Sequence, residues 1–189
     1  CELLVHRQHD HVVRLEARKP NSEGAGEITL DDHLRATLRK RPDRIIIGEC
    51  RGPEAYTMLE AMNTGHEGSL TTIHANDPSS ALVRLMTLAK QGDPTLSEDT
   101  VRAKIAAAID LVVQIQRMSD GSRRITSIEA IGNDIDGHIQ HEPLFYFDHS
   151  DDGAAHRCCH MQPSQIRQRI NDAGYVYDPT WFLDSQGEL

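Results

Sequence analysis

The sequence has 189 residues, of which 38% are hydrophobic and only 4% aromatic, so we expect a core built mainly from aliphatic side chains. Lys and Arg number 20 against 29 Asp and Glu, and the resulting formal net charge of −9 argues against broad nucleic-acid binding, although a few arginines can still bind a phosphate. No apolar run approaches the roughly 18 residues that a membrane span needs, and no secretory signal is visible. Four cysteines without regular disulfide spacing favour a reducing, cytoplasmic compartment.

The first forty residues predict a strand, a turn and a helix. Alternating apolar and polar residues over 11–17 are typical of a strand with one solvent-exposed face. Pro, Asn, Ser and two Gly within 20–26 favour a turn. A helix is expected from Thr29 to Lys40, because Thr29 can cap it and leucines recur at four-residue steps.

The central stretch predicts a βαβ unit. The β-branched run Ile45–Ile47 is typical of a strand buried on both faces, and it is followed closely by Glu49. A helix is expected from about Pro53 to Thr64, and a second strand from Ser69 to His74. Because the carboxyl ends of parallel strands meet at one edge of a sheet, Glu49 and His74 are expected to share that edge, where open α/β sheets bind ligands.

The remainder of the chain predicts three helices, a hairpin and one further strand. The hairpin signal is an Asp-Gly turn between two β-rich runs. In chain order we expect a helix beginning at 77–79, a helix capped at 97–99, the hairpin at 110–131, a strand at Pro143–Phe147 and a helix at Ser164–Ala173.

The stretch from Arg41 to Asn76 carries a family resemblance. Its motifs RPDRIIIGECRG and AMNTGHEGSLTTIHAN resemble the Walker B and His-box regions of the secretion superfamily ATPases, the motors of type II secretion, type IV secretion and type IV pili. The sequence of these motifs is most similar to that of the CpaF type, which drives assembly of tight-adherence (Flp) pili. The later segments AIDLVVQ and DGSRR, with the isoleucine that follows them, also resemble the family.

This resemblance implies an α/β fold, namely part of a RecA-like P-loop NTPase core with a mostly parallel sheet, a carboxyl-terminal hairpin and small helices. It divides the chain into the end of the ATPase domain at 1–132 and a tail or subdomain at 133–189. It also implies ATP, Mg²⁺, a homohexamer and a cytoplasmic position against an inner-membrane platform protein. The implied activity is ATP hydrolysis coupled to pilus assembly or protein export.

A GxxxxGK[ST] phosphate loop is missing from these residues. Because the resemblance is already running at Cys1, we expect the loop upstream of that residue. The 189 residues would then be a carboxyl-terminal piece that is inactive on its own. A non-catalytic scaffold subunit that kept the fold and lost hydrolysis is the alternative.

Glu49 is the first candidate for catalysis. A carboxylate at a strand end can hold the Mg²⁺ shell or orient water, or it can simply pair with Arg51. Gly48 would let the backbone approach a ligand, and Arg51 is either a structural partner or a phosphate ligand. The resemblance to the His box implies that His74 senses the γ-phosphate, whereas a lone histidine is otherwise an ordinary polar residue.

The resemblance adds four lesser candidates. Arg18, and less directly Arg14, resembles an arginine that reaches nucleotide phosphates, often in a neighbouring subunit; the alternative is a surface charge. Arg39 is a candidate for partner-subunit contacts. Glu2 matches the end of the family's acidic box, or is only a frayed terminal residue.

The carboxyl-terminal part is rich in histidine and cysteine, which opens the alternative of a zinc-binding tail module. No CxxC or HxxxH spacing frames these side chains, so we assign no metal ligands and expect a polar loop region instead. The residues concerned are His138, His141, His149, His156, Cys158, Cys159 and His160.

Overall fold

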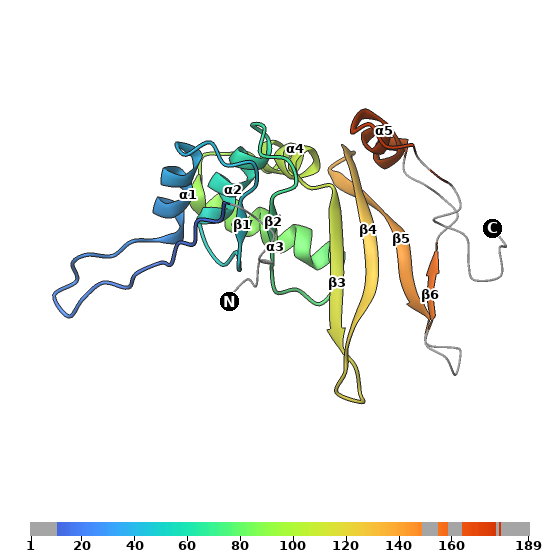
Figure 1. Ribbon diagram of the computed structural model, residues 1–189, viewed down its shortest axis with the longest axis horizontal. Helices are drawn as coiled ribbons and strands as arrows, with labels where there is room; N and C mark the ends of the chain where they lie inside the picture. Colours follow the sequence, from blue (N-terminus) through green and yellow to red (C-terminus); the bar gives the residue numbers. More distant parts are fainter. Residues whose placement is uncertain (1–10, 149–154, 159–163, 177, 179–189) are drawn as a thin grey trace. The chain divides into compact units, whose positions relative to one another are not determined.

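The computed structural model describes residues 11–148, 155–158, 164–176 and 178, and its chain divides into two compact units (Figure 1). Unit 1 is formed by Cys1–Asn76 and Ser80–Ala108, and unit 2 by Asp77–Ser79 and Ile109–Leu189. The boundary expected between residues 132 and 133 falls inside a continuous 13-residue strand that is paired on both sides, so the compact units divide earlier in the chain.

Unit 1 contains the predicted βαβ arrangement. Strands β1 (Ile46–Ile47) and β2 (Leu70–Thr71) pair in parallel, with Ile46 opposite Leu70, and helix α2 (Glu54–Met62) connects them. The remaining helices of this part of the chain are α1 (Leu30–Leu38), α3 (Pro78–Gly92) and α4 (Glu98–Ala108). Both strands are shorter than predicted, but their parallel pairing is confirmed.

The core of unit 1 lies around α2. Ala55, Met58 and Leu59, which the sequence places on one face of this helix, are at most 1% exposed. They are joined in the core by Val101 and Ile105 of α4, which are equally buried. This packing fixes the helix that immediately follows the loop carrying Glu49, and so fixes the loop's downstream end.

Helix α1 begins as predicted. Thr29 caps it, and the Thr29 hydroxyl accepts a hydrogen bond from the Asp32 backbone N–H at 3.1 Å. The Asp32 carboxylate in turn accepts from the Thr29 backbone N–H at 2.8 Å, which completes a capping box with an aspartate in the position where Glu or Gln is usual.

The strand predicted over residues 11–17 is wrong. These residues form no strand, and Val12, Val13 and Leu15 are 43%, 54% and 40% exposed. The chain turns after Asn21 and returns to make an isolated antiparallel bridge between Arg18 and Ile28. Alternation alone does not make a strand, because a strand also needs a partner for its backbone groups.

Unit 2 contains a four-stranded antiparallel sheet in the order β3-β4-β5-β6 (Figure 1). Its elements are β3 (Leu111–Arg117), β4 (Arg123–Ile135), β5 (His138–Asp148), β6 (Ala155–Cys158) and helix α5 (Ser164–Asp172). The hairpin at 110–131 and the helix near 164 are therefore confirmed.

The structure corrects the expected extent of this sheet. Strand β5 begins at His138 rather than Pro143, because Asp136 and Gly137 form a second tight turn in which both φ angles are positive, at 52° and 80°. Strand β6 was not predicted. The α/β class is confirmed, but in the described ranges the parallel pairing is limited to β1 and β2, and the larger sheet is antiparallel.

Candidate functional site

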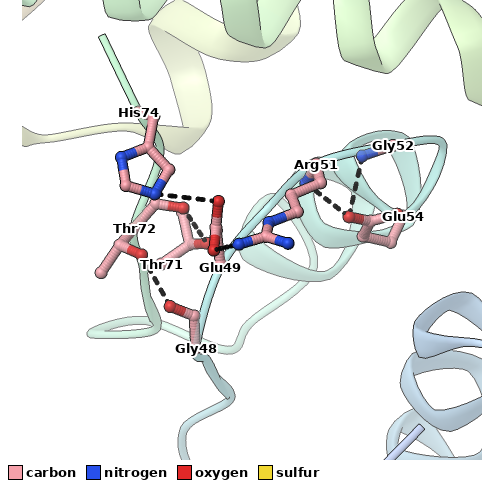
Figure 2. A network of polar contacts seen from close by, with 8 residues as sticks. All are labelled: Gly48, Glu49, Arg51, Gly52, Glu54, Thr71, Thr72 and His74. Carbon is pink, nitrogen blue, oxygen red and sulfur yellow. Dashed lines mark hydrogen bonds and ion pairs between the residues drawn. The ribbon is translucent and has the colours of Figure 1, made fainter. Parts of the chain in front are cut away.

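Glu49 and His74 lie together, as the parallel arrangement of their strands predicts (Figure 2). The distance between Glu49 Oε1 and His74 Nε2 is 3.2 Å. The other carboxylate oxygen of Glu49 accepts a hydrogen bond from the Arg51 guanidinium. One carboxylate thus holds a guanidinium and an imidazole at the carboxyl end of β1.

Backbone contacts fix the spacing of the two strand ends. The Cys50 N–H donates to the Thr72 carbonyl oxygen at 2.9 Å, which continues the β1–β2 pairing past its last paired residue. The Thr72 hydroxyl donates to the Gly48 carbonyl oxygen at 2.6 Å (Figure 2). Glu49 and His74 therefore project from backbone that is tied together on both sides.

The carboxylate is shielded, whereas its two partners are open to solvent. The Glu49 side chain is 16% exposed, against 71% for Arg51 and 80% for His74. The hydrogen bond from Arg51 lowers the pKa of Glu49 below its usual value, and Glu49 raises the pKa of Arg51. At neutral pH the site therefore presents an ionised carboxylate with two exposed donors that a phosphate can reach.

Glu54, the first residue of α2, is a residue of this site that the sequence analysis missed. Its carboxylate accepts hydrogen bonds from the backbone N–H groups of Arg51 at 2.7 Å and Gly52 at 2.9 Å (Figure 2). Glu54 as a whole is only 8% exposed. An acid in the first turn of a helix that follows Gly-Pro was the available signal. Because Glu54 occupies these N–H groups, this loop is not a phosphate cradle, and a phosphate must be held by side chains here.

Cys50 follows Glu49 but is chemically inert. It is 1% exposed, and burial, with smaller contributions from Glu54 and Glu49, raises the pKa of its thiol to about 12. The thiolate needed for nucleophilic attack is therefore absent at neutral pH.

Arg14, Arg18 and Arg39 are the other predicted arginines. The Arg18 Nε donates to the Gly26 carbonyl oxygen at 2.6 Å and so closes its own turn. Arg14 is exposed, and Arg39 is the residue at the carboxyl end of α1. Within residues 11–148, no hydrogen bond or ion pair joins these three to Glu49 or His74, and their roles stay predictions. Glu2 lies outside the described residues.

The described residues hold no group of three or more histidine, cysteine or acidic side chains placed to bind a metal. His141 has two hydrogen-bond partners of its own, Ser79 and Glu129. Most of the predicted histidine- and cysteine-rich tail, namely His149, Cys159 and His160 together with the side chains of His156 and Cys158, lies outside what the structure describes. In the same described part, no helix is long and apolar enough to cross a membrane.

Comparison with known families decides where the chain belongs. The family described as "Type II/IV secretion system protein" matches residues 3–176. The chain belongs to this family. The resemblance found in residues 41–76 is therefore confirmed for the secretion superfamily.

Relatives within this superfamily are longer than the chain. A Mycobacterium tuberculosis (strain H37Rv) protein, Rv3659c, whose name refers to conjugal transfer, is 39% identical over 150 residues, which is 78% of this chain and 42% of that protein. VirB11 of Agrobacterium fabrum is 36% identical over 121 residues, which is 63% of this chain and 34% of VirB11. The chain thus spans less than half the length of either relative.

A solved structure shows the same fold. The VirB11 ATPase of the Brucella suis type IV secretion system, determined in complex with sulphate, aligns with a TM-score of 0.51 and 31% identity over 53% of this chain and 31% of that one. The α/β fold expected from the sequence, part of a P-loop NTPase core, is thereby confirmed.

Proposed function

We propose that the chain is part of an ATPase that couples ATP hydrolysis to movement of a macromolecule through a secretion or pilus machine. The observation that carries this proposal is the ionised Glu49 carboxylate, held between His74 and Arg51 at the carboxyl end of parallel strands. Family membership supports it, since a structural relative that shares this fold is named an ATPase.

The residues divide the chemistry among themselves. Glu49 is charged at neutral pH and so can accept a hydrogen bond from the attacking water and orient it. His74 and Arg51 offer exposed N–H donors that neutralise charge on a terminal phosphate. When that phosphate leaves, His74 would lose a hydrogen-bond partner. The resulting change in the position of His74 would be transmitted to the residues that follow it.

ATP and Mg²⁺ fit this donor set. Mg²⁺ prefers oxygen ligands and keeps several waters, so a single ionised carboxylate beside a water-accessible edge suits its outer shell. The bound ion would neutralise charge on the phosphates during hydrolysis. Glu49 would supply the carboxylate. The β- and γ-phosphates would need backbone donors in addition to the His74 and Arg51 side chains, since the N–H groups of Arg51 and Gly52 are taken by Glu54.

The finer assignments extend this proposal. We place the whole protein in a cytoplasmic homohexamer that works against an inner-membrane platform protein, with Arg14, Arg18 or Arg39 reaching nucleotide in the same or a neighbouring subunit. The resemblance of the sequence of residues 41–76 to the CpaF type favours pilus assembly. One relative is named for conjugal transfer, and the VirB11 ATPase of known structure is named as part of a type IV secretion system. These names favour movement of other substrates through a type IV system.

Turnover by the intact parent protein tests the proposal. We expect the intact protein to hydrolyse ATP and the 189 residues alone to show no turnover, because the side chains described here cannot hold the β- and γ-phosphates by themselves. Released phosphate would be measured for both at saturating ATP and Mg²⁺. An intact protein without activity would favour the scaffold alternative, and turnover by the 189 residues that disappears in Glu49→Gln would contradict the expected inactivity.

A further inference from the structure

The loop between β1 and α2 has a hydrogen-bond acceptor for every backbone N–H from Cys50 to Gly52. The Cys50 N–H donates to the Thr72 carbonyl oxygen at 2.9 Å. The N–H groups of Arg51 and Gly52 both donate to one oxygen of Glu54, Oε1, at 2.7 and 2.9 Å (Figure 2). Shielded N–H groups are rarely left unbonded, and here one side chain serves two of them. Glu54 therefore supplies two of the three hydrogen bonds that fix this loop.

Glu54 reaches back to the loop from the start of α2. Pro53, which precedes it, is the N-cap of the helix but makes no side-chain capping bond, and proline has no N–H of its own. The positive end of the helix favours a carboxylate at this point. The loop is also shaped to admit the carboxylate, because a Cβ on Gly52 would lie only 3.0 Å from Glu54 Oε2. Glu54 is thus enclosed by the loop rather than offered to solvent.

The Arg51 guanidinium depends on this loop for its position. The side chain is 71% exposed and donates a hydrogen bond to the Glu49 carboxylate. An exposed ion pair contributes little by itself, because ordering a long side chain costs conformational entropy. The two residues are separated by one position in a stretch without regular secondary structure, so the backbone conformation decides whether their side chains meet. The hydrogen bond from the Arg51 N–H to Glu54 fixes that conformation at Arg51 itself.

We propose that Glu54 is a positioning residue, which holds the backbone of Arg51 and so places the Arg51 guanidinium on the Glu49 carboxylate. Glu54 acts as a hydrogen-bond acceptor rather than through its charge, and it does not touch the nucleotide. Its effect on hydrolysis rests on the proposed function, whereas its hold on the loop does not depend on any activity.

Two substitutions separate the reach of Glu54 from its charge. Glu54→Gln removes the charge but keeps a carbonyl oxygen in the place of Oε1, and this oxygen can accept from both N–H groups. Glu54→Asp keeps the charge but is one methylene shorter, so its oxygens fall short of the loop. We therefore expect Glu54→Gln to behave much as the unchanged protein does, and Glu54→Asp to resemble Glu54→Ala. Thermal unfolding checks that each variant is folded before the comparison.

Hydrogen–deuterium exchange of the intact protein without nucleotide tests the hold on the loop directly. In Glu54→Ala and Glu54→Asp the amides of Arg51 and Gly52 should exchange about tenfold faster or more, as the loss of hydrogen bonds to a carboxylate implies. In Glu54→Gln the change should stay below about threefold. Glu60→Ala, which removes the ion pair with Lys104 from the same helix, should leave both amides unchanged. Unchanged exchange at these amides in Glu54→Ala would overturn the proposal, whatever the activity.

Hydrolysis by the same variants tests the effect on Arg51. We expect kcat for ATP to fall about five- to fiftyfold in Glu54→Ala and Glu54→Asp with KM within about twofold, because a donor to the terminal phosphate is misplaced while other nucleotide contacts stay intact. Glu54→Gln should keep kcat within about threefold. Faster exchange with unaltered kcat would overturn the link to Arg51 and leave the proposed ATPase function standing. A loss in Glu54→Gln as large as that in Glu49→Gln would show that the charge is needed and would overturn the positioning role.

A double variant tests whether Glu54 acts through Arg51. Arg51→Ala removes the guanidinium, so adding Glu54→Ala to it should lower kcat no further. Losses that multiply would show that Glu54 acts independently of Arg51 and would overturn the proposal. If the intact protein did not hydrolyse ATP, the proposed function would fail, but exchange at the Arg51 and Gly52 amides would still decide whether Glu54 holds the loop.

Discussion

Replacing Glu49 by Gln in the intact protein should lower kcat for ATP hydrolysis by about 10²- to 10⁴-fold. Gln keeps the size of the side chain but removes the charge that orients water and pairs with Arg51. KM for ATP should change little, since the phosphates are held by other residues. Steady-state phosphate release gives both constants.

Two controls sharpen this result. Glu67→Gln removes an exposed carboxylate from the loop before β2 and should leave kcat unchanged. Because the pKa of Glu49 lies below its usual value of about 4.5, the carboxylate stays ionised throughout pH 6–8, and its titration should produce no loss of activity in that range. A Glu49→Gln protein that retains full activity would remove Glu49 from catalysis.

Replacing His74 by Ala should lower kcat by about 10- to 100-fold, because it removes an N–H donor that stabilises the negative charge on the terminal phosphate. His74→Gln retains an amide donor of similar reach and should recover part of the loss. If His74 contributes only to folding, both variants would instead lower the melting temperature and leave kcat per folded molecule intact. Thermal unfolding measured beside phosphate release separates these outcomes.

Local signals in the sequence predicted most elements of the fold. The Thr29 cap, the leucine spacing after it and the Asp-Gly turn at 120–121 each act within a few residues, and each appears in the structure. The strand predicted for residues 11–17 does not form, because a strand needs a distant partner that local alternation does not reveal. Strand β5 was placed too late because the turn at Asp136 and Gly137, which carries the same Asp-Gly signal, was overlooked.

The candidate site was predictable to the extent that topology determines it. A parallel βαβ unit brings the ends of its strands together, so the contact between Glu49 and His74 follows from the order of the elements. The role of Glu54 did not follow, since it depends on how the loop folds back over its carboxylate. The contact between Ser79 and His141 was equally hidden, because it joins residues 62 positions apart.

The most direct test of the central claim is a structure of the intact protein with Mg²⁺ and a non-hydrolysable ATP analogue. We predict that Glu49 lies within one water molecule of the terminal phosphate, and that His74 donates a hydrogen bond to a phosphate oxygen. A nucleotide bound at another face, with the Glu49, Arg51 and His74 cluster unchanged and distant from it, would contradict the account.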